Sequence, residues 1–296
     1  MSQSFNKIGL TVKSGLSYKH EAVESVCRIL KKMNKEIYGD PKRMEDMDGS
    51  SDMKPYKSEN DIDLLIVLGG DGTIMRAIRE LKDFSTPILC INRGTIGFLA
   101  EIELSDVKTD LPLLLNNGGM LDERHMLNIK ALRAKEELFS GYALNDAVIA
   151  QGTIARLVDL HTKINNEELT SFHADGLILS TPTGSTAYSL AAGGPIVHPF
   201  LSATILTPIN PHSFSQKPIV VPSSSKIEVT VSTKTNKFKD TEVVLTLDGQ
   251  VYVPLQHEDK IVISKCTRTV KFLRKREDTF FGTLRDKLKW GERLEI

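Results

Sequence analysis

Short apolar runs alternate with amphipathic segments in the first part of the chain. Strands are predicted over residues 7–12, 64–68 and 87–91, and helices over residues 20–32 and 73–82. In the first helix, apolar residues recur at i, i+3, i+4 and i+7, as on one face of a helix. The second and third strands are continuous apolar runs, which are typical of parallel strands covered on both faces. This β-α-β-α order predicts a parallel sheet flanked by helices.

The segment over residues 34–60 interrupts this pattern. It is polar and contains turn clusters at Gly39-Asp40-Pro41 and Asp48-Gly49-Ser50-Ser51. Such clusters between periodic segments indicate loops. We therefore expect a loop around at most one short strand.

Beyond Asn116-Asn117-Gly118-Gly119 the pattern changes to many short strands. They are predicted over residues 127–133, 142–149, 157–164, 176–180, 219–221, 226–231, 243–247 and 260–265. Turn residues separate them, a spacing that favours a sandwich-like all-β domain. Residues 280–290 return to helical periodicity. We predict an α/β domain over residues 1–118, a mainly β domain over residues 119–277, and a C-terminal helix within residues 278–296 that packs back on the first domain.

Composition narrows the classes of protein. The 296 residues include 38 basic and 38 acidic side chains, so the formal net charge is zero. A neutral chain is not suited to long-range steering onto nucleic acid or an anionic membrane. The three cysteines are far apart and give no disulfide framework, and Cys90 lies in an apolar run as a core thiol would. With no apolar leader or membrane span in the pattern, we expect a reduced, cytoplasmic setting.

The second predicted strand runs directly into Gly69-Gly70-Asp71-Gly72-Thr73 and then into a helix. Glycines let backbone N–H groups approach phosphate, and a helix N-terminus adds partial positive charge. Gly69, Gly70, Gly72 and Thr73 are therefore candidates for binding a phosphate donor. Asp71 repels phosphate, so it needs another purpose: accepting a proton from an attacking hydroxyl, or coordinating Mg²⁺. The alternative is that Asp71 only caps the helix.

A second unusual segment covers residues 174–195. An apolar strand ends in Thr181-Pro182-Thr183-Gly184-Ser185-Thr186, followed by small residues and another glycine turn. Small residues admit a flat ligand, hydroxyls suit ribose and phosphate oxygens, and Tyr188 offers a ring face. The alternative is a Ser/Thr-rich loop on a β domain. The histidines show no metal-binding spacing, so no protein metal site is expected.

Three further pieces are candidates for the same site. Asn145-Asp146 interrupts the apolar pattern of the strand predicted over residues 142–149, where a bulge or an edge position is the alternative. Asp248-Gly249-Gln250 follows a strand and also fits an ordinary hairpin turn. Phe98 follows a glycine-containing turn and either stacks on an adenine or belongs to the core.

Together these segments resemble the NAD kinase family. The matching stretches are residues 68–73, 92–100, 144–149, 175–195, 207–211, 248–250 and 283–290. The resemblance implies an enzyme that transfers a phosphate of ATP, or of polyphosphate, to the 2′-hydroxyl of the adenosine ribose of NAD, in a cleft between the two domains. It also implies Mg²⁺ with the donor and a homodimer or homotetramer.

The resemblance also assigns roles to residues. It implies Asp71 as general base, with Gly72 binding NAD beside it. Asn145 and Asp146 are expected at ribose hydroxyls or the nicotinamide-side nucleotide, and Asp175 at polar groups of the dinucleotide. The remaining NAD contacts that it implies are Arg156, His173, Thr186, Ala187, Tyr188, Ser189, Leu190, Ala191 and Gln250. The family often carries Asn-Glu where this chain has Asn145-Asp146.

The glycine turn alone leaves other functions open. A lipid or sugar kinase uses a similar turn, and a non-catalytic sensor could bind NAD or NADP in the same cleft. The choice of phosphate donor, the preference for NAD or NADH and the oligomeric state are not encoded in these motifs.

Overall fold

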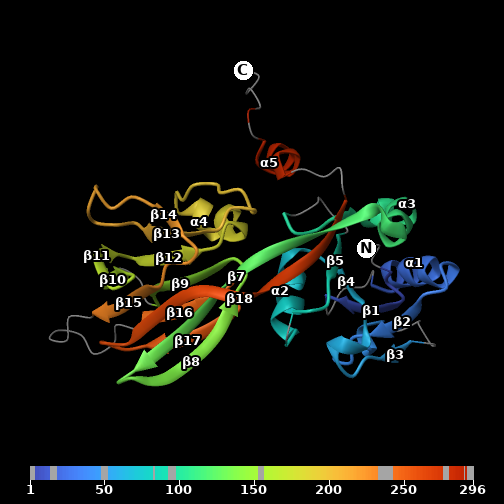
Figure 1. The fold of residues 1–296 in the computed structure, drawn as a ribbon, viewed down its shortest axis with the longest axis horizontal. Coiled ribbons are helices and arrows are strands. Elements are labelled where there is room, and N and C mark those ends of the chain that lie inside the picture. Colours follow the sequence, from blue (N-terminus) through green and yellow to red (C-terminus); the bar gives the residue numbers. More distant parts are fainter. Residues whose placement is uncertain are drawn as a thin grey trace. The chain divides into compact units, whose positions relative to one another are not determined.

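The computed structural model describes residues 4–13, 19–47, 53–82, 84–92, 98–152, 157–232, 243–275, 280–289 and 291. The chain divides into two compact units (Figure 1). Unit 1 comprises residues 1–123 and 270–296, and unit 2 comprises residues 124–269.

Unit 1 is built on a parallel sheet with the strand order β5-β4-β1-β2-β3. Its strands are β1 (Lys7–Val12), β2 (Glu36–Gly39), β3 (Lys54–Pro55), β4 (Leu64–Leu68), β5 (Ile88–Asn92) and β6 (Ile102–Glu103). Its helices are α1 (Lys19–Lys32), α2 (Asp71–Glu80), α3 (Val107–Leu113) and α5 (Phe280–Leu288). All strand pairs among these six are parallel, so the predicted sheet is confirmed.

Helices cover both faces of this sheet. Leu64, Ile66 and Leu68 pack with apolar residues of α1 and α3, which lie side by side (Figure 1). Alternate residues of a strand face opposite ways. Leu65 and Val67 therefore face the other side, where Leu65 shares a hollow with Ala77 of α2. Cys90 is fully buried in β5, as expected of a core thiol, and burial raises its pKa.

The expectation for residues 34–60 is wrong in one respect. Two short strands form there, because β2 pairs with β1 and β3 extends the sheet as its edge strand. Pro55 is tolerated at that edge, where a missing N–H costs no ladder hydrogen bond. Polar residues of the segment are also buried: Asp40 accepts a 2.7 Å hydrogen bond from Thr11 and pairs with Arg43, which pairs in turn with Glu80.

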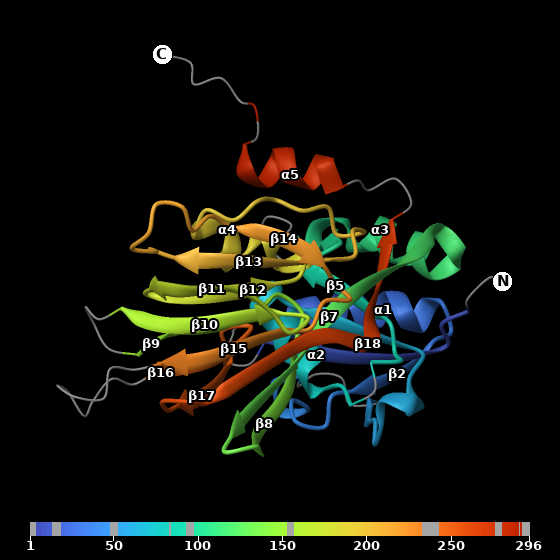
Figure 2. The same ribbon diagram turned by 60° about the vertical axis from the view of Figure 1, so that its left-hand side comes forward.

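Unit 2 contains antiparallel strands in two sheets (Figure 2). One sheet has the order β14-β13-β12-β9-β16-β17, and the other contains β11-β10-β15-β18 with β7 and β8. Their bounds are β7 (Gly119–Arg133), β8 (Glu136–Ala143), β9 (Asp146–Gln151), β10 (Val158–Ile164), β11 (Glu167–Ala174), β12 (Gly176–Ser180), β13 (Ala203–Ile209), β14 (Ile219–Pro222), β15 (Ile227–Ser232), β16 (Val243–Leu247), β17 (Val251–Leu255) and β18 (Lys260–Lys275). The strands β7 and β18 continue from unit 2 into unit 1.

One core cluster joins the inward faces of both sheets. Ile149 and Leu177 come from the first sheet, while Leu160, Val229 and Ile261 come from the second. The sandwich-like, mainly β second part is therefore confirmed. The sequence pattern does not indicate β8, β11, β13 and β17. Asn165 and Asn166, both with positive φ, form the turn that joins β10 to β11.

The single strand expected over residues 142–149 is wrong. The structure ends β8 at Ala143 and begins β9 at Asp146. The break is stabilised by Asp248, whose carboxylate accepts hydrogen bonds from the backbone N–H groups of Leu144, Asn145 and Asp146 at 2.9, 2.8 and 3.1 Å. A distant side chain thus ends a strand that the local pattern would continue.

Candidate active site

A glycine turn joins β4 to α2 in unit 1. Gly70 is the N-cap of α2, and Asp71 is its first residue. Gly69 has φ of +156°, and a Cβ there would lie 2.5 Å from the hydroxyl oxygen of Thr73. The Gly69 N–H donates to the carbonyl of Ile91 at 2.9 Å, which holds the turn at the carboxyl ends of two neighbouring parallel strands. Ligands of open α/β sheets bind at that edge.

Gly72 and Thr73 differ in whether they are accessible to a ligand. A Cβ at Gly72 would meet no described heavy atom within 4 Å, so Gly72 borders open space at the helix N-terminus. Thr73 lies inside the turn: its side chain is buried, and its N–H donates to the carbonyl of Gly70 at 2.8 Å. The backbone of Gly70 to Gly72 is therefore the part of the turn best placed for phosphate.

Asp71 does not cap the helix, so that alternative is wrong. Gly70 occupies the cap position, and no side-chain cap hydrogen bond is formed. The carboxylate oxygen Oδ1 of Asp71 is buried and has no hydrogen-bond partner among the residues that the structure describes. Burial raises the pKa of Asp71, while Lys287, the Leu99 N–H, Arg274 and the Phe98 N–H act in the opposite direction. A buried carboxylate oxygen without a partner is rare, and here it leaves an acceptor for a ligand hydroxyl.

In unit 2, the segment after β12 packs tightly onto the break between β8 and β9. A Cβ at Gly184 would lie 2.1 Å from the carbonyl oxygen of Asn145, so only glycine fits there. The Thr181 hydroxyl donates to the carbonyl of Leu144, and its N–H donates to the carbonyl of Asn145 at 2.9 Å. These contacts bring the residue pair Asn145-Asp146 and the segment over residues 181–185 together, as expected from the sequence.

Asp146 is nearly buried beside a second carboxylate. Asp146 is the first residue of β9, and its backbone N–H donates to the carboxylate of Asp248. Burial raises the pKa of Asp146 to about 7, and the neighbouring charge of Asp248 acts in the same direction. Two carboxylates this close cannot both ionise without cost. Asp248 follows β16 with φ of 50° and, with Gly249, forms the turn that leads to Gln250 and β17, so the hairpin expected at this position is present.

The remaining candidate residues of unit 2 lie in two groups. Tyr188 and Ala191 are exposed, Thr186, Ala187 and Leu190 are partly buried, and Ser189 is buried, with its hydroxyl 2.9 Å from that of Thr207. In the second group, Asp175 accepts a 2.9 Å hydrogen bond from Asn210. His173 Nδ1 lies 2.6 Å from Asp159 Oδ1, and its ring makes an edge contact with His212. Arg156 lies outside the described residues.

Several residues that shape these sites were not found from the sequence. The sequence indicates Asp248 only as part of a turn, and it gives no prediction for Arg274, which donates to the carbonyl of Phe98 at 3.0 Å. Phe98 itself is partly buried. The signal for Arg274 was present, because it shares a strand face with the apolar Val270 and Phe272. A basic residue on such a face needs a buried partner.

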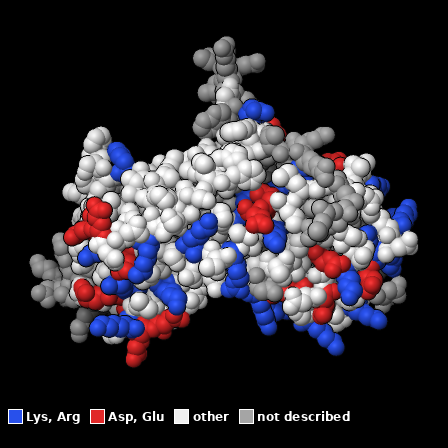
Figure 3. Space-filling model, viewed as in Figure 1, with Lys and Arg blue, Asp and Glu red and all other residues white. Residues whose placement is uncertain are grey.

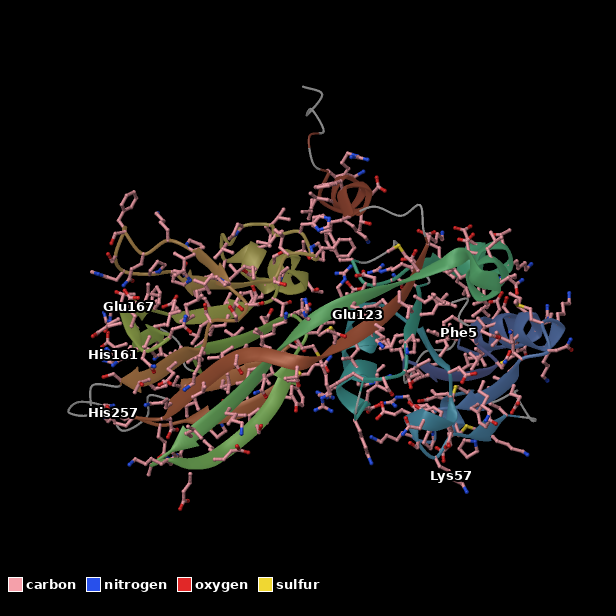
Figure 4. All side chains as sticks on the ribbon, in the orientation of Figure 1. Phe5, Lys57, Glu123, His161, Glu167 and His257 are labelled. Carbon is pink, nitrogen blue, oxygen red and sulfur yellow. The ribbon has the colours of Figure 1, made fainter. Side chains whose placement is uncertain are left out.

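Neither the distribution of charged side chains nor the arrangement of metal-ligand residues points to a further site among the described residues. On the face drawn in Figure 3, acidic and basic side chains are interspersed over the described residues. Figure 4 labels His161 on β10 and His257 in the turn before β18. Among the described residues, no three His, Cys, Asp or Glu side chains gather so that they could hold a metal ion. No described helix has the length and apolar character needed to cross a bilayer.

Comparison with known proteins agrees with this arrangement. The family description "ATP-NAD kinase N-terminal domain" matches residues 8–120, and "ATP-NAD kinase C-terminal domain" matches residues 144–275. An NAD kinase of Geotalea daltonii is 43% identical over 78% of this chain and 80% of its own length. An NAD kinase of Geobacter sulfurreducens is 44% identical over the same shares.

Solved structures show the same fold. The crystal structure of yeast NADH kinase complexed with NADH has a TM-score of 0.85 at 27% identity, covering 99% of this chain and 90% of that one. An NAD kinase from Archaeoglobus fulgidus in complex with ATP has a TM-score of 0.72 at 25% identity, covering 94% and 98%. Both domains match, in order, over most of the chain. The chain therefore belongs to the NAD kinase family, whose members are phosphotransferases.

Proposed function

We propose that this chain phosphorylates the 2′-hydroxyl of the adenosine ribose of NAD, with ATP as donor and Asp71 as general base. The observation that carries the proposal is the buried, unpartnered Oδ1 of Asp71 beside the glycine turn. In-line phosphoryl transfer needs an acceptor for the hydroxyl proton and donors for the phosphate charge. Asp71 supplies the first, and the backbone of Gly70 to Gly72 supplies the second.

The raised pKa of Asp71 suits this role. A base is most effective when its pKa approaches the working pH while it still ionises. Burial raises the pKa of Asp71, and the positive charges of Lys287 and Arg274 with two backbone N–H groups partly offset that rise. With its raised pKa, the carboxylate of Asp71 is a stronger base than that of an exposed aspartate.

Binding of NAD is assigned to unit 2. Asn145 and Asp146 present polar groups at a rigid break between two strands, and Asp175 presents a carboxylate at the start of β12. Tyr188 exposes 48% of its surface as a ring for stacking, and Thr186 to Ala191 form the surface around it. Arg156, His173, Gln250 and Phe98 remain proposed contacts. The match to the C-terminal NAD kinase domain supports a dinucleotide acceptor over a lipid or a sugar.

Magnesium fits the donor side of this site. Mg²⁺ prefers oxygen ligands and is held by one or two carboxylates together with substrate phosphates. Because Asp71 serves as the base in this proposal, the donor phosphates and water would supply the Mg²⁺ ligands, and no cluster of further protein ligands is needed. When bound, Mg²⁺ would neutralise charge on the donor phosphates.

We also infer a homodimer or homotetramer. Unit 2 exposes large apolar side chains on or next to the paired strands β13 and β14, with Phe200, Leu201 and Val220 exposed by 64%, 55% and 50%. Light scattering on the purified chain measures this directly: a mass of 32.9 kDa would contradict the inference.

The assay for the main proposal offers NAD or NADH to the purified chain with Mg²⁺ and ATP, another nucleoside triphosphate or polyphosphate. Formation of NADP is followed with a dehydrogenase specific for NADP, which does not accept a 3′-phosphorylated product. We expect turnover with NAD and ATP. Binding of NAD without turnover with any of these donors would instead identify a sensor.

A further inference from the structure

A buried charge cluster lies at the C-terminal end of β18 in unit 1. The side chain of Arg274 is 11% exposed. Its Nη1 lies 2.8 Å from Glu101 Oε2, and its Nε lies 3.5 Å from Asp122 Oδ2. Burial lowers the pKa of Arg274, but these two carboxylates outweigh burial and raise it. A buried guanidinium is tolerated only with such partners, so the cluster holds a charged arginine in one orientation.

The third nitrogen of this guanidinium contacts the backbone at residue 98, which acts on Asp71. Nη2 of Arg274 donates to the carbonyl oxygen of Phe98 at 3.0 Å. The backbone N–H groups of Phe98 and Leu99 act on the carboxylate of Asp71. Arg274 therefore binds the carbonyl of Phe98, the same residue whose N–H acts on the candidate base Asp71.

The backbone between these contacts is anchored on both sides. The Glu101 N–H donates to the carbonyl of Cys90 in β5 at 2.9 Å, and Glu101 Oε1 accepts the Lys275 N–H at 2.6 Å. Leu99 and Ala100 are buried. On the side of residue 98, Arg274 supports this backbone through its hydrogen bond to the Phe98 carbonyl. A planar, three-point fork fixes orientation better than a flexible ammonium group.

We infer that Arg274 is a positioning residue for phosphoryl transfer, because it fixes the backbone at residues 98–99 that orients the carboxylate of Asp71. The inference rests on the proposed role of Asp71. Its alternative is an ion-pair cluster that contributes to stability alone. The two differ in what they do to the reaction: a positioning residue changes the rate of the chemical step even where its charge is kept, whereas a purely structural one leaves that rate unchanged in the folded enzyme.

Four variants separate these roles. Arg274→Met removes both charge and fork, and Arg274→Lys keeps the charge but loses the fork. Lys275→Met is the matched control, since Lys275 is the next residue of the same strand and pairs with Asp110 at 2.6 Å without contacting Phe98. Asp71→Asn reports on the proposed function itself. For each variant that folds by circular dichroism, kcat, the KM values for NAD and ATP, and the pH profile of kcat are measured.

For Arg274→Met we expect kcat to fall about 10–100-fold, the scale of small misplacements of catalytic groups, with KM values within about 3-fold. Loss of a positive charge near Asp71 raises the pKa of that carboxyl further, so the acid limb of the pH profile moves to higher pH. For Arg274→Lys we expect a lower kcat and an acid limb close to that of the wild type. This variant tests the inference if Arg274→Met does not fold. Lys275→Met keeps kcat.

The results that would overturn the inference are distinct from those that overturn the proposed function. If Asp71→Asn abolishes turnover while folded Arg274→Met or folded Arg274→Lys keeps wild-type kcat, Arg274 is structural only, whatever happens to the acid limb. An equal loss of kcat in Lys275→Met also overturns it, because the effect is then not specific to the contact with Phe98. If Asp71→Asn itself retains kcat, the proposed function is wrong.

Discussion

The burial of Asp146 beside Asp248 predicts that the free energy of unfolding depends on pH. Asp146 is 5% exposed, and burial raises its pKa in the folded chain to about 7. In the unfolded chain its pKa returns to about 3.9. Between pH 4 and pH 7 the folded state therefore holds a proton that the unfolded state releases, so the contribution of Asp146 to stability improves as pH falls. Above pH 7 both states are ionised, and the folded state carries the full cost of the buried charge.

Asp146→Asn removes this titration and keeps the shape of the protonated side chain. At about 1.4 kcal/mol per pKa unit, the cost of the wild-type carboxylate is about 1–2 kcal/mol at pH 5 and about 4 kcal/mol at pH 8. The variant should therefore gain stability relative to wild type between these pH values, by on the order of 2–3 kcal/mol.

Urea unfolding followed by circular dichroism at pH 5, 6, 7 and 8 measures the difference. Glu167→Gln, at the exposed start of β11 and labelled in Figure 4, controls for loss of one carboxyl from unit 2. A difference between wild type and Asp146→Asn that is the same at pH 5 and pH 8 would refute the reasoning, because Asp146 would then titrate alike in the folded and unfolded chain.

Two further substitutions test the geometry around this pair. Asp248→Ala removes the acceptor of three backbone N–H groups and should lower the free energy of unfolding by about 2–5 kcal/mol, measured by urea unfolding, and raise the KM for NAD. An unchanged urea midpoint would contradict the account of the strand break. Gly184→Ala places a Cβ 2.1 Å from the Asn145 carbonyl oxygen and should cost about 1–3 kcal/mol with a raised KM for NAD. A wild-type KM in this variant would show that the Asn145 backbone does not position the NAD contacts.

The parts of the fold that follow from local pattern were predictable. The continuous apolar run of β4 and the helical spacing in α1 identify a covered parallel sheet, and Gly69 marks the turn because no side chain fits beside Thr73. Many short strands with turn residues between them were enough to indicate the mainly β second part.

The parts that depend on distant partners were not predictable. From the sequence, Asn145 and Asp146 are only a polar interruption within a predicted strand, and the break there depends on the carboxylate of Asp248, about a hundred residues away. Asp40 and Arg43 look like solvated loop residues until they meet Thr11 and Glu80. The surroundings of Asp71 depend in the same way on groups brought by the chain's last strand and helix.

The central claim is that Asp71 accepts the proton of the 2′-hydroxyl, and Asp71→Asn tests it most directly. The amide keeps the size of the side chain at the start of α2 but cannot act as a base. We predict that kcat for NADP formation falls by about 10²–10⁴-fold, as loss of a general base typically does, while calorimetry shows NAD binding close to wild type. A folded Asp71→Asn enzyme with near wild-type kcat would contradict the account.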